Sequence, residues 1–401
     1  MSLNPLKTSN REEGTAHTAG RPRILIATGA SGGHIFPAIA IADALKDRGY
    51  DCVFVGYGGK FAGPVLERGY TYEQLPAYPW NVSNPLKKIR AVWGLVQALV
   101  RAMHLIQRYH PSVVLGMGGY ATVAAVIAGK LSGVPTAIHE QNVLPGRANR
   151  LLMRWVDKML LSFDRSRKYV HKVPDARLLL CGNPVRQEVL DAMSIKRPDD
   201  GDFYITVMGG SQGARVLSDV VPAAVAMLGA EVRKTLRVVH QAREEDVLRV
   251  KQAYVDAGVV CDVAPFFTDM AVRIRRCHLF IGRAGAGTVA ECAVLGRPAV
   301  FVPLKLADGH QFDNAKVMTD VGAATIMTEE SFTAQALADW LRDLLADPKR
   351  RQQMEQNALR VAVPDAALLC AQAVCDLSKD DVMHMVRPVD ATPQAKEVNA
   401  K

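Results

Sequence analysis

The 401-residue chain is short of several features that would define a protein class at once. No window reaches about 18 uninterrupted apolar residues, so no membrane-spanning helix is expected. The first twenty residues are polar and contain no apolar h-region, so no secretory signal is predicted. Neither a P-loop G-x-x-x-x-G-K-[ST] nor an H-E-x-x-H zinc motif occurs. These absences favour a cytoplasmic protein and argue against P-loop ATPases and zinc hydrolases.

Metal-binding patterns are also scarce. The seven cysteines form no C-x-x-C pair and no zinc spacing, and four of them sit in or beside apolar runs, as buried free thiols do in a reducing compartment. His139-Glu140 resembles the start of a metal motif, but the residue four after His139 is Val143 rather than a second histidine. The acidic run 199–202 is typical of a solvated turn. We therefore expect no metal site.

Size and charge narrow the class further. With 49% hydrophobic and 22% charged residues, the chain has enough core-forming material for two domains of roughly 150–200 residues each. The formal net charge of +9 favours anionic partners, which include nucleic acids, acidic lipid head groups and phosphorylated substrates. Charge alone does not choose among them.

Apolar runs of strand length alternate with helical stretches, which predicts an α/β fold with parallel sheets covered on both faces. The expected strands of the first half are 23–28, 51–56, 112–116, 134–138, 158–162 and 177–181. Those of the second half are 203–208, 235–240, 258–263, 278–282, 298–302 and 323–327.

The expected hinge between the two halves is Gly182-Asn183-Pro184-Val185-Arg186 with the polar stretch 194–202 that follows. The predicted domains are 21–186, joined by a C-terminal helix at about 362–376, and 187–361. Hydrophobe-poor segments at 1–20 and 377–401 are expected to be disordered tails.

Three glycine-rich turns each follow a strand-like run and precede a helical pattern. They read Gly29-Ala30-Ser31-Gly32-Gly33-His34, Gly116-Met117-Gly118-Gly119-Tyr120 and Gly209-Gly210-Ser211-Gln212-Gly213-Ala214. A strand, a glycine turn and a helix start bring free backbone N–H groups and a positive dipole end to one point, which suits a phosphate or a crowded polar ligand. Two turns in the first half and one in the second indicate two nucleotide-type folds facing each other across a cleft.

The first turn does not have the spacing of a dinucleotide site. A dehydrogenase fingerprint needs G-x-G-x-x-G and an acidic residue at the end of the next strand, whereas here the second strand ends in Gly56-Tyr57-Gly58-Gly59. The turn instead places His34 in the first turn of a helix, where the dipole disfavours its protonated form. His34 is therefore a candidate proton acceptor, with a packing or capping histidine as the equal alternative.

A fourth glycine loop, 282–291, offers the best diphosphate site in the chain. A strand ends near Gly282 and a helix begins near Ala286, so backbone N–H groups are presented to a ligand. Glu291, one turn inside, can accept both hydroxyls of a ribose, although a solvated first-turn glutamate is the commoner case. The following loop carries His310-Gln311-Phe312-Asp313-Asn314, whose amides offer the donors and acceptors that sugar hydroxyls require.

The segment 78–106 combines aromatic, basic and apolar residues. Apolar residues recur at helical spacing at positions 89, 92, 93, 96, 99, 100 and 103, with Lys87, Lys88, Arg90 and Arg101 off that stripe. The default expectation is an amphipathic helix packed on the sheet. The alternative is that these basic residues, beside Trp80 and Trp93, dock on an anionic bilayer surface.

Taken together, these segments resemble the MurG family, the peptidoglycan N-acetylglucosaminyltransferases that convert lipid I to lipid II. The resemblance covers about residues 22–376 and rests on seven segments in the family's order. They are the three glycine turns, His139-Glu140-Gln141-Asn142, Gly182-Asn183-Pro184-Val185-Arg186, the 283–291 loop and Gln311-Phe312-Asp313-Asn314-Ala315. The residue before Gln311, often a glutamine in the family, is His310 here, which would alter one sugar contact.

The resemblance implies a GT-B fold, with two facing Rossmann-like domains, and a set of site residues. It implies His34 as the catalytic base. The donor UDP-GlcNAc would be lined by Ser31, Gly32, Gly33, Asn142, Arg186, Ser211, Phe267, Ala286, Gly287, Thr288, Val289, Ala290, Glu291, Gln311 and Asn314. Phe266-Phe267 would lie near uracil, Glu291 on the ribose, and Gln311 with Asn314 near the GlcNAc hydroxyls. The acceptor side would include Gly118, Gly119, Tyr120 and Glu140.

The implied reaction is an inverting transfer of GlcNAc from UDP-GlcNAc to the C4 hydroxyl of the MurNAc-pentapeptide on undecaprenyl diphosphate. The helix start at 286–288 would stabilise the departing diphosphate, so no cofactor and no metal are expected. The expected partners are UDP-GlcNAc, lipid I, the anionic cytoplasmic membrane surface and other cell-wall assembly proteins, with no nucleic acid. The expected location is peripheral, on the cytoplasmic face of the inner membrane.

Three alternatives stay open on the sequence alone. One is another GT-B glycosyltransferase that acts on a different lipid. The second is a UDP-GlcNAc epimerase of similar fold, which the acceptor-side glycines and the membrane-type segment disfavour. The third is a non-catalytic nucleotide-sugar-binding scaffold, which the joint presence of His34, Asn142, Arg186, Glu291 and Gln311 disfavours.

Overall fold

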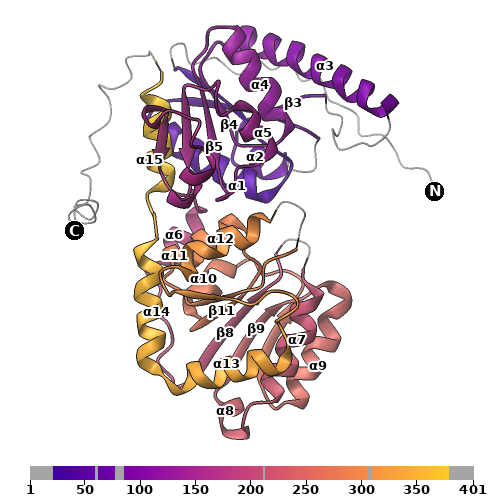
Figure 1. Cartoon of the computed structure of the whole chain (residues 1–401), viewed down its shortest axis with the longest axis vertical. Helices are drawn as coiled ribbons and strands as arrows, with labels where there is room; N and C mark the ends of the chain where they lie inside the picture. The colour runs from indigo at the N-terminus through magenta and orange to yellow at the C-terminus, as the bar shows by residue number, and fades with distance from the viewer. Residues whose placement is uncertain (1–20, 59–61, 77–84, 211–212, 306–308, 379–401) are drawn as a thin grey trace.

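A computed structural model describes residues 21–58, 62–76, 85–210, 213–305 and 309–378, with residues 85–90 described by their backbone alone. Two domains follow one another along the long axis, each built on its own parallel sheet (Figure 1). The predicted tails lie outside the described residues, apart from Leu377 and Ser378, which extend the last helix by a turn.

The first domain has a seven-stranded sheet in the order β3-β2-β1-β4-β5-β6-β7. Its strands are β1 (Arg23–Ala27), β2 (Asp51–Gly56), β3 (Thr71–Gln74), β4 (Pro111–Gly116), β5 (Thr136–Glu140), β6 (Lys158–Leu161) and β7 (Leu178–Leu180). Its helices are α1 (Gly32–Lys46), α2 (Gly63–Glu67), α3 (Pro85–Tyr109), α4 (Tyr120–Leu131) and α5 (Arg147–Leu152), with 3₁₀ turns η2 (Asp164–Tyr169) and η3 (Asp175–Arg177).

The second domain has a six-stranded sheet in the order β10-β9-β8-β11-β12-β13. Its strands are β8 (Phe203–Met208), β9 (Leu236–Gln241), β10 (Val260–Ala264), β11 (Leu279–Gly282), β12 (Ala299–Phe301) and β13 (Ala324–Ile326). Around it lie α6 (Gln187–Ala192), α7 (Arg215–Ala226), α8 (Ala230–Lys234), η4 (Glu244–Asp246), α9 (Val247–Asp256), α10 (Met270–Arg276), α11 (Ala286–Val294), α12 (His310–Thr319), α13 (Ala334–Ala346) and α14 (Pro348–Arg360).

Each sheet is apolar on both faces because helices cover both. In β1, Ile24 and Ile26 enter one buried cluster with residues of α1, whereas Leu25 and Ala27 enter another with residues of α3 and α4. Successive residues of a strand point to opposite faces, so a continuous apolar run is what a doubly covered strand requires. The predicted α/β fold with two facing parallel-sheet domains is confirmed.

The chain crosses between the domains twice. It leaves the first domain after β7 through residues 181–186, and α6 then packs against α10 and α11 of the second. It returns after α14 through residues 361–365, and α15 (Ala366–Cys375) packs against α1 of the first domain. Figure 1 shows this last helix, in yellow, lying alongside the first domain.

The expected strands match the observed ones to within two residues at each end, with one omission. The omitted strand, β3, pairs with β2 at the edge of the first sheet and is only partly covered. Its sequence, Thr71-Tyr72-Glu73-Gln74, has no apolar run, so the pattern that found the other strands could not find this one.

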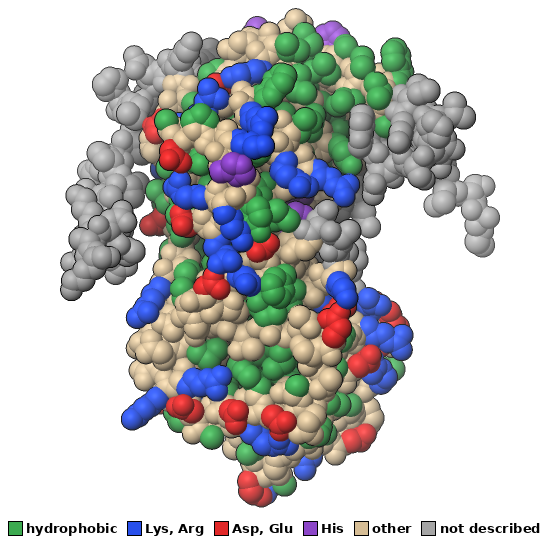
Figure 2. All heavy atoms as spheres, viewed as in Figure 1, with side chains coloured by type: hydrophobic (Ala, Val, Ile, Leu, Met, Phe, Trp, Pro, Cys, Tyr) green, Lys and Arg blue, Asp and Glu red, His purple; other side chains and the backbone are tan. Residues whose placement is uncertain are grey.

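Helix α3 differs from the expectation in which face it buries. It packs on α4 through Ala91, Ala98, Ala102 and Leu105, whose mostly small side chains allow close approach. Val92, Trp93, Val96 and Val100, expected to face the sheet, are exposed instead. Figure 2 shows hydrophobic side chains gathered at the end of the first domain where Figure 1 places this helix.

The basic side chains of 87–90 and the residue Trp80 lie outside what the structure describes. No helix in the described part of the chain combines the length and the apolar character that crossing a bilayer requires.

Candidate active site

The loops at the carboxyl ends of the two sheets meet between the domains. Loop 141–146 after β5 touches α12, which follows β12 of the other sheet. In open α/β sheets, ligands bind outside the carboxyl ends of the strands, because helix N-termini and loop backbones converge there. The contact brings the loop that carries Asn142 against the helix that carries Gln311 and Asn314.

His34 lies between the first two glycine turns. A Cβ on Gly29 would come within 2.8 Å of its Nδ1, and one on Gly118 within 2.8 Å of its Nε2. Gly118 also has a φ of +97°, which side-chain-bearing residues rarely adopt. A Cβ on Gly119 would approach Gly29 Cα to 2.7 Å, so the two turns pack directly on one another. Here the glycines make room for an imidazole ring.

The ring of His34 is held by one hydrogen bond. Ser31 Oγ lies 2.7 Å from its Nδ1, and Ser31 is the residue that precedes α1. Burial, and secondarily the nearby His139, lowers the pKa of His34 to about 4. The expected neutral state at pH 7 therefore has a different main cause from the one predicted, since desolvation rather than the helix dipole is the largest contribution.

Glu140, predicted on the acceptor side, is fully buried and organises the loop that follows it. Its Oε1 accepts from the backbone N–H of Asn142 at 2.9 Å, and its Oε2 accepts from the N–H of Gly146 at 2.9 Å and from Asn149 Nδ2 at 2.8 Å. A carboxylate that accepts this many hydrogen bonds from the protein stabilises the conformation of the loop rather than binding a substrate. Of the other acceptor-side residues, Gly118 is buried, Gly119 is partly exposed and Tyr120 is exposed.

Asn314, expected near the sugar, joins the two domains. Its Oδ1 accepts from the backbone N–H of Val143 at 2.9 Å, and its Nδ2 donates to Asn142 Oδ1 at 3.1 Å and to Ala284 O at 3.2 Å. The side chain is completely buried, so its amide is engaged by protein groups from both domains. The side chain of Asn142 is engaged as well, since its Oδ1 accepts from Asn314 and its Nδ2 donates to Glu140 Oε1 at 3.3 Å.

His310, the position that departs from the family pattern, adds to this junction. Its Nδ1 lies 2.9 Å from Leu144 O, so the ring bridges α12 to the loop of the first domain. Tyr169 Oη donates to Asp313 Oδ2 at 2.9 Å, and Arg165 pairs with Asp320. These contacts bind helix α12 to the first domain from its first turn to its C-terminal end.

Arg186 and Glu291 form an ion pair across the hinge. Arg186 Nη2 and Nε lie 3.2 and 3.3 Å from Glu291 Oε1, and the Arg186 guanidinium also lies 5.5 Å from the ring centroid of Phe36 on α1. Only 12% of the Glu291 side chain is exposed, against 34% for Arg186. Burial raises the pKa of Glu291, and the charge of Arg186 opposes that shift. Glu291 is thus not the solvated glutamate of the alternative interpretation.

The start of α11 is open to a ligand. Gly285 precedes the helix, and a Cβ on Gly287 would meet nothing within 4 Å. Gly287 and Thr288 are partly exposed, whereas Val289 is fully buried and Ala286 and Ala290 nearly so. The backbone of the first turn of α11 is therefore open to a ligand, and its N–H groups suit an anion.

The remaining predicted donor residues divide between ligand-facing and core positions. Gln311 Oε1 accepts from Leu304 N–H at 3.0 Å, which orients its Nε2 as the free donor. The ring of Phe267 is 8% exposed and lies 4.1 Å from the Arg273 guanidinium, whereas Phe266 is 71% exposed. Of the pair expected near uracil, only Phe266 presents its ring. Ser211 lies outside the described residues, and Ser31, Gly32 and Gly33 are at least partly exposed beside His34.

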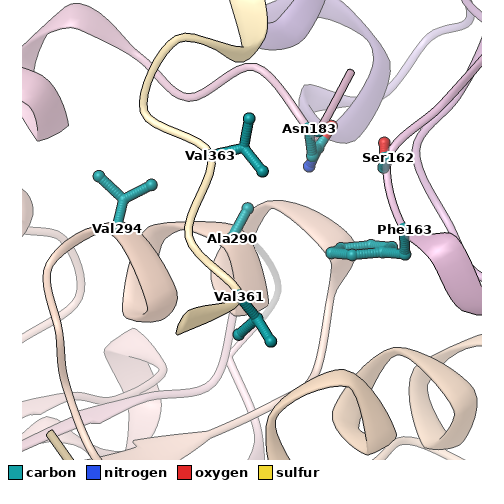
Figure 3. A pocket seen from close by; sticks show the side chains of 8 residues that line it. Ser162, Phe163, Asn183, Ala290, Val294, Val361 and Val363 are labelled. Carbon is teal, nitrogen blue, oxygen red and sulfur yellow. The ribbon is translucent and has the colours of Figure 1, made fainter. Parts of the chain in front are cut away.

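A small cavity lies at the hinge, where both crossing segments meet. It is lined by Ser162, Phe163, Gly182, Asn183, Ala290, Val294, Val361 and Val363 (Figure 3). Asn183 is buried, and within the described part of the chain neither of its amide atoms has a hydrogen-bond partner. The cavity separates the first domain from α11 and is distinct from the loops around His34.

Comparisons with known proteins agree with this geometry. The glycosyltransferase family 28 N-terminal domain matches residues 24–161, and the family 28 C-terminal domain matches residues 204–369. A protein of Phenylobacterium zucineum (strain HLK1) is 38% identical over 361 residues, which is 88% of this chain and 98% of that protein. One of Paramagnetospirillum magneticum (strain ATCC 700264 / AMB-1) is 40% identical over 362 residues, which is 89% of this chain and 97% of that protein.

Both relatives are named UDP-N-acetylglucosamine–N-acetylmuramyl-(pentapeptide) pyrophosphoryl-undecaprenol N-acetylglucosamine transferase. This chain belongs to the MurG family. The crystal structure of Acinetobacter baumannii MurG superposes with a TM-score of 0.73 at 27% identity, covering 88% of this chain and all of that one. Membership of the MurG family confirms the resemblance inferred from the seven segments.

Two residues of this MurG-family site were missed by sequence reasoning. Phe36 contacts Arg186 although it lies in α1, and its spacing from the glycine turn carries no signal for that contact. Asn149, on α5, donates a hydrogen bond to Glu140. It is only 2% exposed, and the burial of this polar residue can be recognised only in the fold. Both act through contacts between elements distant in sequence, which periodicity does not reveal.

Proposed function

We propose that this chain carries out the reaction for which its family is named, the transfer of GlcNAc from UDP-GlcNAc to the lipid-linked MurNAc-pentapeptide, by a single inverting displacement. The observation that supports this mechanism most is the pairing of two features across the interdomain region. A neutral, hydrogen-bonded His34 lies on the first domain, and an open helix N-terminus lies on the second.

His34 is the general base in this mechanism. Its Nδ1–H donates to Ser31 Oγ, which leaves the lone pair of Nε2 to take the proton of the attacking C4 hydroxyl. The lowered pKa keeps the ring neutral through the physiological pH range. Attack on C1 of GlcNAc from the face opposite UDP forms the new C–O bond as the bond to the diphosphate breaks, and inverts the configuration to β.

The second domain holds the donor. N–H groups at Gly287 and Thr288 donate hydrogen bonds to the departing diphosphate and stabilise the negative charge that develops on it. Glu291 accepts the ribose hydroxyls, and Arg186 turns from Glu291 toward the phosphates when the nucleotide enters. Gln311 Nε2 donates to a hydroxyl of GlcNAc, and Phe266 lies against uracil.

Because the acceptor is lipid-linked, the proposed reaction takes place at a bilayer surface, and we propose that the first domain docks there. Val92, Trp93, Val96 and Val100 form an exposed apolar row on α3, and Arg101 lies beside it. Apolar side chains beside basic ones favour the interface of an anionic bilayer. We place the peripheral docking surface here, on the cytoplasmic face of the membrane.

One experiment tests the reaction against its alternatives. The enzyme is incubated with UDP-GlcNAc in the presence and absence of a lipid I analogue, and UDP release and the anomeric configuration of the product are measured. Acceptor-dependent UDP release with a β-1,4-linked product supports the proposal. Acceptor-independent epimerisation, or nucleotide binding without turnover, would refute it.

A further inference from the structure

Two cysteines from distant parts of the sequence meet beside the hinge. Cys181 directly follows β7, and Cys370 lies in α15, the helix that returns from the second domain. Both side chains are fully buried as free thiols, and their sulfur atoms are 3.0 Å apart. A disulfide bond is about 2.05 Å long, so the two sulfurs need to approach by only about 1 Å.

His139 completes this cluster. One of its ring nitrogens and the two sulfurs lie within 4.8 Å of one another, and all three residues are buried. Its Nδ1 lies 3.1 Å from Gln141 Nε2 and its Nε2 lies 3.2 Å from Gly182 O. The amide nitrogen of Gln141 can only donate, so Nδ1 accepts and the proton is on Nε2, which donates to Gly182.

This arrangement favours a dithiol over a metal site. The lone pair of His139 is already engaged by Gln141, so the ring has none free for a metal ion. Two thiolates on one tetrahedral zinc would be about 3.8 Å apart, since each Zn–S bond is about 2.3 Å. The observed 3.0 Å separation is shorter.

The two thiols are not equivalent. The Cys370 thiol donates to the sulfur of Cys181, and this bond with the neighbouring His139 lowers the pKa of Cys181 to about 6. Burial raises the pKa of Cys370 well above its ordinary value. The Cys181 sulfur, which accepts the thiol hydrogen of Cys370, is therefore the nucleophile and Cys370 the resolving thiol.

We propose that Cys181 and Cys370 are a reversible oxidation site that forms an intramolecular disulfide with hydrogen peroxide as the oxidant. The Cys181 thiolate attacks one peroxide oxygen, which breaks the O–O bond, forms a sulfenic acid and releases hydroxide. The sulfur of Cys370 then attacks the Cys181 sulfur, and the second hydroxide leaves. The two sulfurs together lose two electrons, peroxide gains them, and the two thiol protons end in two water molecules.

Oxidation would join the start of the first crossing segment to α15. The entire second domain lies between Cys181 and Cys370 in the sequence, so the bond closes one covalent loop around it. Cross-linking so large a loop restricts the unfolded chain, and we expect the Tm of the oxidised protein to rise by on the order of 5–10 °C. The hinge cavity is lined by Gly182, the residue after Cys181. This inference does not depend on the proposed function.

The test uses the full chain, treated with rising amounts of hydrogen peroxide. The protein is quenched in acid, alkylated under denaturing conditions, digested without reductant and mapped by mass spectrometry. Cys261, the half-buried cysteine of β10, serves as an internal measure of exposure to oxidant. The expected result is a cross-linked peptide containing Cys181 and Cys370, lighter than the two thiol peptides by two hydrogens and lost on treatment with dithiothreitol.

Two variants and one control separate the proposal from a structural role. In Cys370→Ala the resolving thiol is absent, so Cys181 should be trapped as a sulfenic acid by dimedone. Cys181→Ala should give no such adduct at Cys370. Cys277→Ala removes another buried cysteine, in the second domain, and should leave the cross-link and the Tm shift unchanged.

The wild-type measurement alone can overturn the proposal. It fails if Cys261 becomes oxidised while Cys181 and Cys370 remain thiols. It also fails if the purified protein carries one equivalent of zinc that is lost in Cys181→Ala, because the cluster would then be a metal site.

Discussion

The glycine turns of the first domain and the glycine loop at the start of α11 are similar in sequence but serve opposite purposes. In the first domain, a Cβ on Gly29 or Gly118 would strike the imidazole of His34 within 2.8 Å. At the start of α11, a Cβ on Gly287 would meet nothing within 4 Å. The glycines of the first domain pack against a protein side chain, whereas those at the start of α11 leave backbone N–H groups free for a ligand. A glycine-rich turn after a strand therefore does not by itself identify a phosphate site.

The variant expected to show the largest difference between the two regions is His34→Ala. Loss of the base should lower kcat by about 10²–10⁴-fold with little change in the KM for UDP-GlcNAc, because general-base assistance acts in the transition state. Steady-state kinetics with a lipid I analogue measures both values. An unchanged kcat would remove His34 from the role of base.

The same glycine-to-alanine change should have different results in the two regions. Gly118→Ala forces a Cβ against His34 Nε2 at a φ of +97°, and the displaced ring should lower kcat by about 10²-fold. Gly287→Ala is the matched control, since it lies in a helix with open space around it. It should keep kcat and the fold, and raise only the KM for UDP-GlcNAc. Equal losses of kcat in the two variants would contradict the comparison.

The second domain is probed by Glu291→Ala. Loss of a charged acceptor for the ribose should raise the KM for UDP-GlcNAc by about 10–100-fold and change kcat less. Glu231→Ala, which breaks an exposed pair with Lys234, is the control and should change neither value. A KM that does not move in Glu291→Ala would rule out the ribose contact.

The smallest expected effect is in the pH profile. With the pKa of His34 at about 4, against an ordinary value of 6.5, kcat should fall by less than about twofold between pH 7 and 5.5. An unperturbed histidine would lose most of the activity in that range. Initial rates across pH, with circular dichroism as the control for folding, decide between the two.

The same pKa has a consequence for stability. The unfolded chain binds a proton at His34 near pH 6.5, and the folded chain only near pH 4, so protonation favours unfolding between those values. Stability should therefore decline as pH falls from about 6.5 to about 4. Buried His240, whose pKa burial lowers to about 3, contributes in the same direction.

Much of the architecture was predictable because the signals are local. Both sheets are doubly covered, so their strands are continuous apolar runs, and the start of α11 at Ala286 follows from its glycines. The exposed edge strand β3 and the outward face of α3 were not predictable, since neither follows from periodicity. On α3 the small residues line the buried face, and the larger apolar residues are exposed to solvent.

The residues of the site also divide into those that the sequence could predict and those that it could not. Sequence pattern identified His34, Glu291 and the helix start as candidates, the resemblance to the MurG family added Arg186, and the family comparisons agree with the fold that joins them. It could not distinguish residues that face a ligand from residues that hold the domains together. Asn314 and Glu140 carry the same polar groups as their ligand-facing neighbours, and only their burial and partners assign them to the framework.

The sequence by itself determined the two parallel-sheet domains, the order of the glycine loops and the family, because each depends on residues close together in the chain. Only the tertiary structure decided which glycines enclose a side chain, which amides bridge the domains, and that Cys181 meets Cys370. The last two depend on packing between segments far apart in the chain, as with the two cysteines, whose positions differ by 189. Periodicity and spacing carry no information about such contacts, since many pairings of the same elements would satisfy the same local pattern.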